Sequence, residues 1–206
     1  LTALFAVGLY FSFGRSGWLG FLVAVIAMSM IRYKRLIFIF PFLLLIVVML
    51  IPGFSQRFAD ISFSSHDDGT VSTLDQRLMY WQAALEVQQQ SPILGVGFGV
   101  GRYVVGEYRG MYPNMIHNDY ISVLLETGIL GLVLFLLWQG QWLVSLIQTY
   151  RGTFIDFDKT MALAVMVSFI GSLVMRITDN IVLDSFDMYP ISALVAAVLA
   201  IPRIRS

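Results

Sequence analysis

Residues 117–131, HNDYISVLLETGILG, mark the point where a long polar segment of the chain returns to apolar sequence. His117, Asn118 and Asp119 come first, and the residues from 120 to 147 then contain a single charged side chain, Glu126. An apolar run of this length is sufficient for a helix across a bilayer, which takes about 20 residues. The stretch therefore separates a polar segment before it from a membrane segment after it.

The composition of the whole chain is that of a membrane protein. Of 206 residues, 58% are hydrophobic and 13% are charged, and the mean hydropathy is +0.79. Soluble domains carry about 25% charged residues, so the excess apolar surface needs a bilayer. A net charge of zero argues against a nucleic-acid partner, and the lack of cysteine excludes thiolate metal sites. Because the chain begins inside an apolar run, we expect it to be the C-terminal part of a longer membrane protein.

Six apolar segments predict an all-α polytopic membrane protein. They cover residues 1–13, 18–31, 36–52, 120–147, 160–175 and 189–201. Residues 1–52 are then three transmembrane helices with an outward turn, Gly14-Arg15-Ser16-Gly17. Residues 53–118 are one long loop, and residues 119–206 are three further transmembrane helices.

The distribution of charge predicts the orientation. The turns at residues 32–35 and 151–159 and the tail at 203–205 fall on one side of a six-helix arrangement. That side holds Arg32, Lys34, Arg35, Arg151, Lys159, Arg203 and Arg205 against Asp156 and Asp158. By the positive-inside rule this side is cytoplasmic, so the loop at 53–118 faces outward.

An amphipathic helix is predicted within this loop, at about residues 74–90. Thr73 is its expected N-cap, with Gln76 completing a capping box. The expected apolar stripe consists of Leu78, Trp81 and Leu85. Arg77 and Trp81 are four residues apart and so are neighbours on the helix surface. Two interpretations stay open: both face a ligand, or Trp81 packs against the membrane helices and Arg77 is simply solvated.

Residues 95–101, GVGFGVG, alternate glycine with apolar residues. No strand–turn–helix unit surrounds them, so they are not a dinucleotide fingerprint. Either bare backbone N–H groups approach a phosphate, or the chain needs tight turns close to the bilayer.

His117 is one of two histidines, and it is the candidate for catalysis. The other, His66, lies far away in a polar turn, so no metal site is predicted. His117 stands at the start of a predicted transmembrane helix. A non-catalytic role there would be contact with lipid headgroups. Glu126 lies further along the same helix, where a carboxylate is costly unless it is paired or hydrated. An arginine is its expected partner.

Arg15 and Arg176 are outward arginines at the ends of predicted helices. Arg15 stands among small residues and is either a headgroup anchor or a ligand of a buried anion. All outward cations are arginines, whose planar guanidinium binds a phosphate at two points.

Three motifs resemble those of the O-antigen ligase and polymerase superfamily. They are Gly14-Arg15-Ser16-Gly17-Trp18, where the superfamily has a Ser-Arg-Gly order; Arg77-x-x-x-Trp81 followed by Ser91-Pro92-Ile93-Leu94-Gly95; and His117-Asn118-x-Tyr120-Ile121 followed by Glu126-x-Gly128. The motifs occur in the superfamily's order and extend over most of the chain.

The resemblance implies a metal-independent, cofactor-free glycosyltransferase on the periplasmic face of the bacterial inner membrane. Its donor is a glycan on undecaprenyl pyrophosphate, and its acceptor is a hydroxyl of a lipid A core, another glycan or a protein. Arg15 and Arg77 match arginines that hold the pyrophosphate, and His117 matches the histidine proposed to activate the acceptor. We expect the substrate site to include Trp81, Asn118, Arg176 and Glu126.

This chemistry agrees with the residues present, since arginines neutralise a departing diphosphate without a metal. A single displacement inverts the anomeric centre and needs no nucleophilic side chain. Ligase, repeat-unit polymerase and protein O-oligosaccharyltransferase activities are not separated by the sequence. A second hypothesis is a transporter of anionic lipid or polysaccharide, with Arg15, Glu126 and Arg176 along its route. A third is an assembly scaffold.

Overall fold

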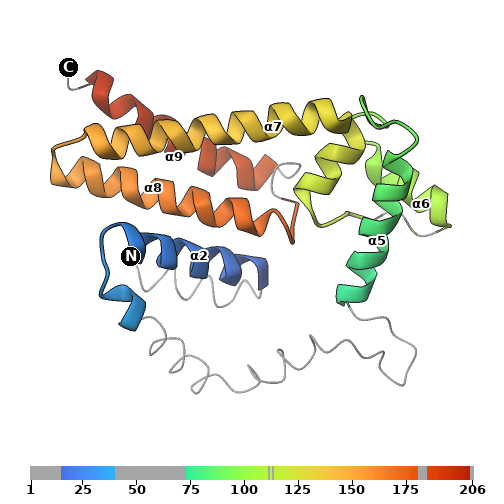
Figure 1. Ribbon diagram of the computed structural model, residues 1–206, viewed down its shortest axis with the longest axis horizontal. Helices are drawn as coiled ribbons and strands as arrows, with labels where there is room; N and C mark the ends of the chain where they lie inside the picture. Colours follow the sequence, from blue (N-terminus) through green and yellow to red (C-terminus); the bar gives the residue numbers. More distant parts are fainter. Residues whose placement is uncertain (1–14, 40–72, 111, 113, 181–184, 205–206) are drawn as a thin grey trace. The chain divides into compact units, whose positions relative to one another are not determined.

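The computed structural model describes residues 15–39, 73–110, 112, 114–180 and 185–204. The helices of this part are α2 (Arg15–Ile31), α5 (Thr73–Gln88), α6 (Gly101–Arg109), α7 (Asp119–Gly152), α8 (Asp156–Met175) and α9 (Ser185–Ile204) (Figure 1). No strand occurs among the described residues. The predicted all-α class is therefore confirmed for them.

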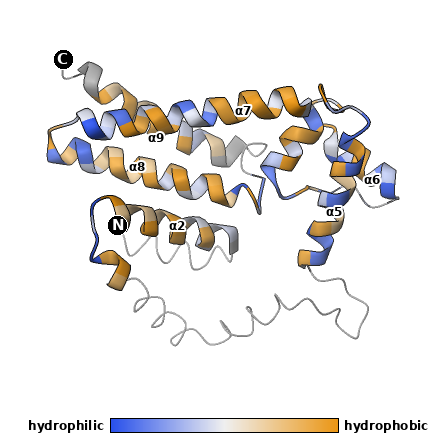
Figure 2. Ribbon diagram, viewed as in Figure 1, coloured by the Kyte–Doolittle hydropathy of each residue, from blue (hydrophilic) through white to orange (hydrophobic). Residues whose placement is uncertain are grey.

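Two of the described helices, α7 and α8, are long and apolar enough to cross a membrane. Shorter apolar helices occupy Ser16–Ile31 and Met188–Ile201, where two further spans are predicted. The predicted segment 1–13 and most of segment 36–52 lie outside the described residues. A total of six spans thus stays a prediction. Figure 2 shows the apolar residues along α7 and α8 and the polar residues where these two helices join.

The chain divides into two compact units. We call them the bundle unit, which is Leu1–Lys34 with Leu134–Ser206, and the loop unit, which is Arg35–Val133. Helix α7 begins in the loop unit and continues into the bundle unit.

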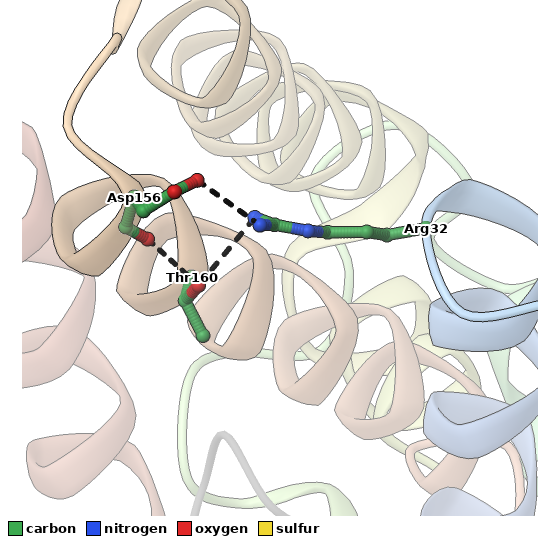
Figure 3. Close-up of polar contacts among 3 residues, drawn as sticks. All are labelled: Arg32, Asp156 and Thr160. Atoms are coloured by element: carbon green, nitrogen blue, oxygen red, sulfur yellow. Dashed lines mark hydrogen bonds and ion pairs between the residues drawn. The ribbon is translucent and has the colours of Figure 1, made fainter.

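In the bundle unit, α2 runs antiparallel to α8. At one end the Ser16 hydroxyl donates to Asp179 Oδ2 at 2.8 Å. At the other end Arg32 donates to Asp156 Oδ1 at 3.2 Å, and it also reaches the Thr160 hydroxyl at 3.4 Å (Figure 3). These contacts join α2 and α8 at both ends of the pair.

Small residues let α2 and α8 approach closely between these ends. A Cβ added to Gly171 would lie 2.4 Å from the carbonyl oxygen of Gly20. A Cβ on Gly20 would lie 2.4 Å from the side chain of Met175. Such close contacts of small residues are a common way for helices to associate in membranes. The hydrophobic core of this unit consists of Leu146, Ala162, Leu163, Val165, Met166, Val167, Phe169, Val195 and Val198.

The loop unit has its own core, built by α5, α6 and the start of α7. Its buried residues are Tyr80, Ala83, Ala84, Val87, Val105, Ile116 and Leu125. The first four form the inner face of α5, at the spacing of one helical stripe. The predicted stripe is therefore wrong: Leu78 and Leu85 are 37% and 42% exposed, and only Trp81 packs against this core.

A break at Gly128 divides α7, and the apolar pattern did not predict it. Gly128 has φ 67° and ψ −170°, and a Cβ there would lie 2.1 Å from the carbonyl oxygen of Ile93. Only glycine meets both conditions without strain. The predicted segment 120–147 thus consists of a short helical segment up to residue 127 and a long apolar helix from residue 129.

Candidate active site

Helix α5 holds the chain that precedes His117. The Tyr80 hydroxyl donates to the carbonyl oxygen of Tyr112 at 2.7 Å. The Trp81 indole N–H donates to the carbonyl oxygen of Ile116, also at 2.7 Å. Ile116 itself is buried in the core of the loop unit. The backbone that precedes His117 is thus held at Tyr112 and Ile116 by two neighbouring aromatic residues of α5.

His117 adopts a left-handed backbone conformation, with φ 53°. Among the described residues it is the one non-glycine residue with positive φ. This conformation costs an L-residue about 1–2 kcal/mol, so the surrounding contacts must impose it. The side chain is half-buried, and its Nδ1 atom is inaccessible to solvent.

Asn118 fixes the chain on the other side of His117 by capping α7. Its side-chain Oδ1 accepts the N–H of Ile121 at 3.0 Å. Its carbonyl oxygen accepts both the N–H and the hydroxyl of Ser122, at 2.9 and 2.8 Å. This is the geometry of a helix N-cap. His117 therefore lies between two anchored residues, and its ring has a fixed point of attachment.

Residues 92–100, which we call the glycine loop, wrap around the other end of the short helical segment. Gly95, Gly97 and Gly99 all have positive φ. A Cβ on Gly95 would lie 2.4 Å from the backbone of Glu126. Both observations agree with the tight-turn interpretation of the alternating glycines.

Glu126 is 5% exposed and binds this loop through its carboxylate. Oε2 accepts the N–H of Gly99 at 2.9 Å, and Oε1 accepts the N–H of Gly101 at 3.1 Å. Within the described part of the chain, its partners are these backbone groups and not the arginine predicted. The backbone N–H groups of Gly99 and Gly101 thus bind a carboxylate of the protein itself.

Arg77 lies on α5, one helical turn before Trp81. Its side chain is half-buried, and its Nε atom is inaccessible to solvent. The loop unit therefore contains five of the predicted site residues: Arg77, Trp81, His117, Asn118 and Glu126. Tyr80 was missed, since its role depends on a hydroxyl that reaches a carbonyl 32 positions later.

Arg15 and Arg176 belong to the bundle unit. The backbone of Arg15 begins α2, and the bond between Ser16 and Asp179 brings this point to the end of α8 where Arg176 lies. Arg176 is fully buried. Its guanidinium carbon lies 5.8 Å from the centroid of the Phe135 ring. The structure thus brings these two arginine positions to one end of the bundle.

The described residues contain no group of three His, Asp or Glu side chains that could hold a metal ion. His66 lies outside the described residues.

Comparison with known proteins agrees with the resemblance. The family model described as O-antigen ligase matches residues 1–136, which is more than half of the chain. A region of 79 residues is 30% identical to a protein from Rhizobium meliloti (strain 1021) described as "Exopolysaccharide production protein ExoQ". That match covers 32% of this chain and 18% of the length of the relative. This chain belongs to the O-antigen ligase family.

Proposed function

We propose that this chain transfers a glycan from undecaprenyl pyrophosphate to an acceptor hydroxyl, at the periplasmic face of a bacterial inner membrane. Membership of the O-antigen ligase family supports glycosyl transfer, and the name of the similar exopolysaccharide protein supports a role in polysaccharide biosynthesis. The two apolar helices that are long enough to cross a membrane support a lipid-borne substrate.

The observation that carries the proposal is the backbone of His117. A histidine held at φ 53° between a capped helix and a hydrogen-bonded carbonyl costs conformational energy. Strained residues of this kind cluster at active sites, because the strain fixes the direction of a side chain. A helix-start residue that only touches headgroups needs no such conformation.

In the proposed reaction, the acceptor oxygen attacks the anomeric carbon of the donor glycan. The bond from that carbon to the pyrophosphate oxygen breaks, and its electron pair stays on the diphosphate. His117 takes the proton of the acceptor hydroxyl as general base. Arg77 stabilises the charge that grows on the leaving group, and this needs no metal ion. Arg15 is the second arginine that the family resemblance assigns to the pyrophosphate.

The remaining predicted site residues have supporting roles within their own units. Trp81 and Asn118 hold the backbone on either side of His117. Glu126 holds the glycine loop. Arg176, buried at the end of the bundle where α2 begins, adds positive charge near the start of that helix. We therefore assign these four residues to positioning and electrostatic support.

Replacement of His117 by asparagine is the direct test. Asparagine accepts positive φ readily, so His117→Asn keeps the backbone and removes the base. Transfer of a carrier-linked glycan by the purified protein should fall by about 10²–10⁴-fold. His66→Asn is the matched control and should retain transfer. Wild-type transfer by His117→Asn would remove this residue from the mechanism.

A second pair of variants separates two roles for Arg77. Arg77→Lys keeps the charge but loses the two-point binding of a phosphate, so the rate should fall. Arg102→Lys, at an exposed position of the same unit, should not affect the rate. Full activity of Arg77→Lys would mean that Arg77 has a structural role and does not bind the phosphate at two points.

The nature of the acceptor is open within the proposal. A growing glycan would be the acceptor of a repeat-unit polymerase. A lipid A core would be the acceptor of an O-antigen ligase, and a protein hydroxyl that of a protein O-oligosaccharyltransferase. Supplying each acceptor separately distinguishes them. A transporter or a scaffold would form no new glycosidic bond with any of the three.

A further inference from the structure

The glycine loop combines an apolar surface with exposure to the surroundings. Its sequence, PILGVGFGV, contains no charged or polar side chain. Ile93, Leu94 and Phe98 are 64%, 69% and 77% exposed. An apolar cluster of this kind on a protein surface usually marks a contact site for a membrane or another protein.

The loop lies directly beside the start of the long apolar part of α7. The N–H of Ile129 donates to the carbonyl oxygen of Pro92 at 2.9 Å, and that of Leu130 donates to Ile93 at 3.4 Å. Ile129 and Leu130 are themselves about half exposed. The exposed apolar surface of the loop is therefore continuous with that of a helix able to cross a membrane.

The length of this helix places the loop near the edge of the hydrocarbon layer. Residues 129–152 rise about 1.5 Å each, which gives about 36 Å in total. The hydrocarbon core of a bilayer is about 30 Å thick. When a helix of this length crosses a bilayer, a loop attached to residues 129 and 130 comes to one boundary of that core.

The backbone of the loop satisfies part of the condition for entering an apolar layer. There, every N–H group needs a partner within the protein. The N–H groups of Ile93, Leu94, Phe98 and Val100 depend on the headgroup boundary, where water and lipid oxygens accept hydrogen bonds. The other four N–H groups of the loop have partners in the loop unit. They are Gly95 to the carbonyl oxygen of Ser91 (2.9 Å), Val96 to that of Leu125 (2.9 Å), Gly97 to that of Glu126 (3.0 Å), and Gly99 to Oε2 of Glu126 (2.9 Å).

We propose that the glycine loop inserts into one leaflet of the bilayer, with Ile93, Leu94 and Phe98 at the boundary of headgroups and acyl chains. The buried carboxylate of Glu126 then has a structural purpose, since it binds the N–H of Gly99 at the end of the loop and that of Gly101 at the start of α6. The partner of this surface is the bilayer itself, because the surface continues that of α7. The proposal is independent of catalysis by His117.

Site-directed spin labelling tests the insertion. The chain has no cysteine, so Phe98→Cys provides a single labelling position, and the exposed position of Phe98 limits the loss of packing. Glu107→Cys, exposed on α6 in the same unit, is the matched aqueous position. The labelled chain is reconstituted in vesicles of phosphatidylethanolamine and phosphatidylglycerol without any donor glycolipid. Nitroxide stearates in the same vesicles calibrate depth.

Collision rates with dissolved oxygen and with a water-soluble nickel complex give the depth of each label. We expect the label at position 98 to favour oxygen, as the stearates do, and the label at position 107 to favour nickel. Equal preference for nickel at both positions would overturn the insertion. Protection from both reagents would mean that protein covers the loop, which would overturn it as well. Oxygen preference that appears only when lipid-linked donor is added would assign the surface to the donor's tail instead of the bilayer.

Discussion

The carboxylate of Glu126 offers the sharpest perturbation of the loop unit. Each of its two bonds joins a charged oxygen to a backbone N–H, at 2.9 and 3.1 Å. Hydrogen bonds to charged groups contribute about 1.5–3 kcal/mol each, and the 5% exposure of Glu126 leaves little screening by water. Glu126→Ala removes both acceptors, so opening of the glycine loop should become easier by about 3 kcal/mol or more. Glu126→Gln keeps one acceptor oxygen and should cost about half as much.

Hydrogen exchange of the amides of Gly99 and Gly101 measures this directly. Since about 1.4 kcal/mol corresponds to a factor of ten, exchange should accelerate by about 100-fold or more in Glu126→Ala. In Glu126→Gln the acceleration should be about tenfold. Mass spectrometry of peptides spanning residues 92–101, with the protein in lipid nanodiscs, resolves such changes.

Glu107→Ala is the matched control, because it removes one carboxylate of the same unit from an exposed position. Its exchange pattern in residues 92–101 should equal that of the unmodified chain. If Glu126→Ala also left this exchange pattern unchanged, the carboxylate would not hold the glycine loop in place.

Two further substitutions test the break in α7 and the anchor on α5. Gly128→Ala should lower the melting temperature, because φ of Gly128 is positive and the new Cβ would meet Ile93. Gly140→Ala in the same helix has open space for its Cβ and should leave the melting temperature unchanged. Equal melting temperatures of the two variants would refute the break at Gly128. Trp81→Phe removes an indole donor at 2.7 Å and should cost about 1 kcal/mol of stability and slow glycosyl transfer. Trp138→Phe, at a partly exposed ring of α7, should leave both stability and transfer unchanged. Equal effects of the two variants would remove the anchoring role of Trp81.

The all-helical character could be predicted from the sequence because it depends on long apolar runs. The inner face of α5 could not. Pattern analysis favours large apolar side chains such as Leu78 and Leu85 as the buried stripe. The structure instead buries Ala83 and Ala84 and leaves both leucines exposed. In a protein with so much apolar surface, the size of a side chain is a poor guide to which face is inside.

The partner of Glu126 illustrates a second limit of prediction from sequence. A carboxylate within an apolar run suggests a cationic partner, and six outward arginines were available for the role. The N–H groups that satisfy it belong to glycines about 25 positions earlier, and no side-chain pattern reveals a backbone donor. The alternating glycines were the available signal, since positive φ at every second residue turns N–H groups to a common side. Arg77, His117 and Asn118 were identified through motifs, but the strain at His117 became visible only in the backbone dihedral angles.

The short helical segment between Asn118 and Gly128 connects the two proposals. It begins at the cap beside His117 and ends at the glycine loop, and nine residues at about 1.5 Å each make it about 14 Å long. If the loop lies at the edge of the hydrocarbon, His117 stands at most about this far above it, since any tilt of the segment only reduces the height. The polar layer on each side of a bilayer is about 5–8 Å thick, and a diphosphate linked to a polyprenol lies within or just above it. The loop would thus set the height of the base at the level where a lipid-linked sugar meets water. A variant that weakens insertion of the loop should accordingly lower the rate of transfer even though His117 and Arg77 are unchanged.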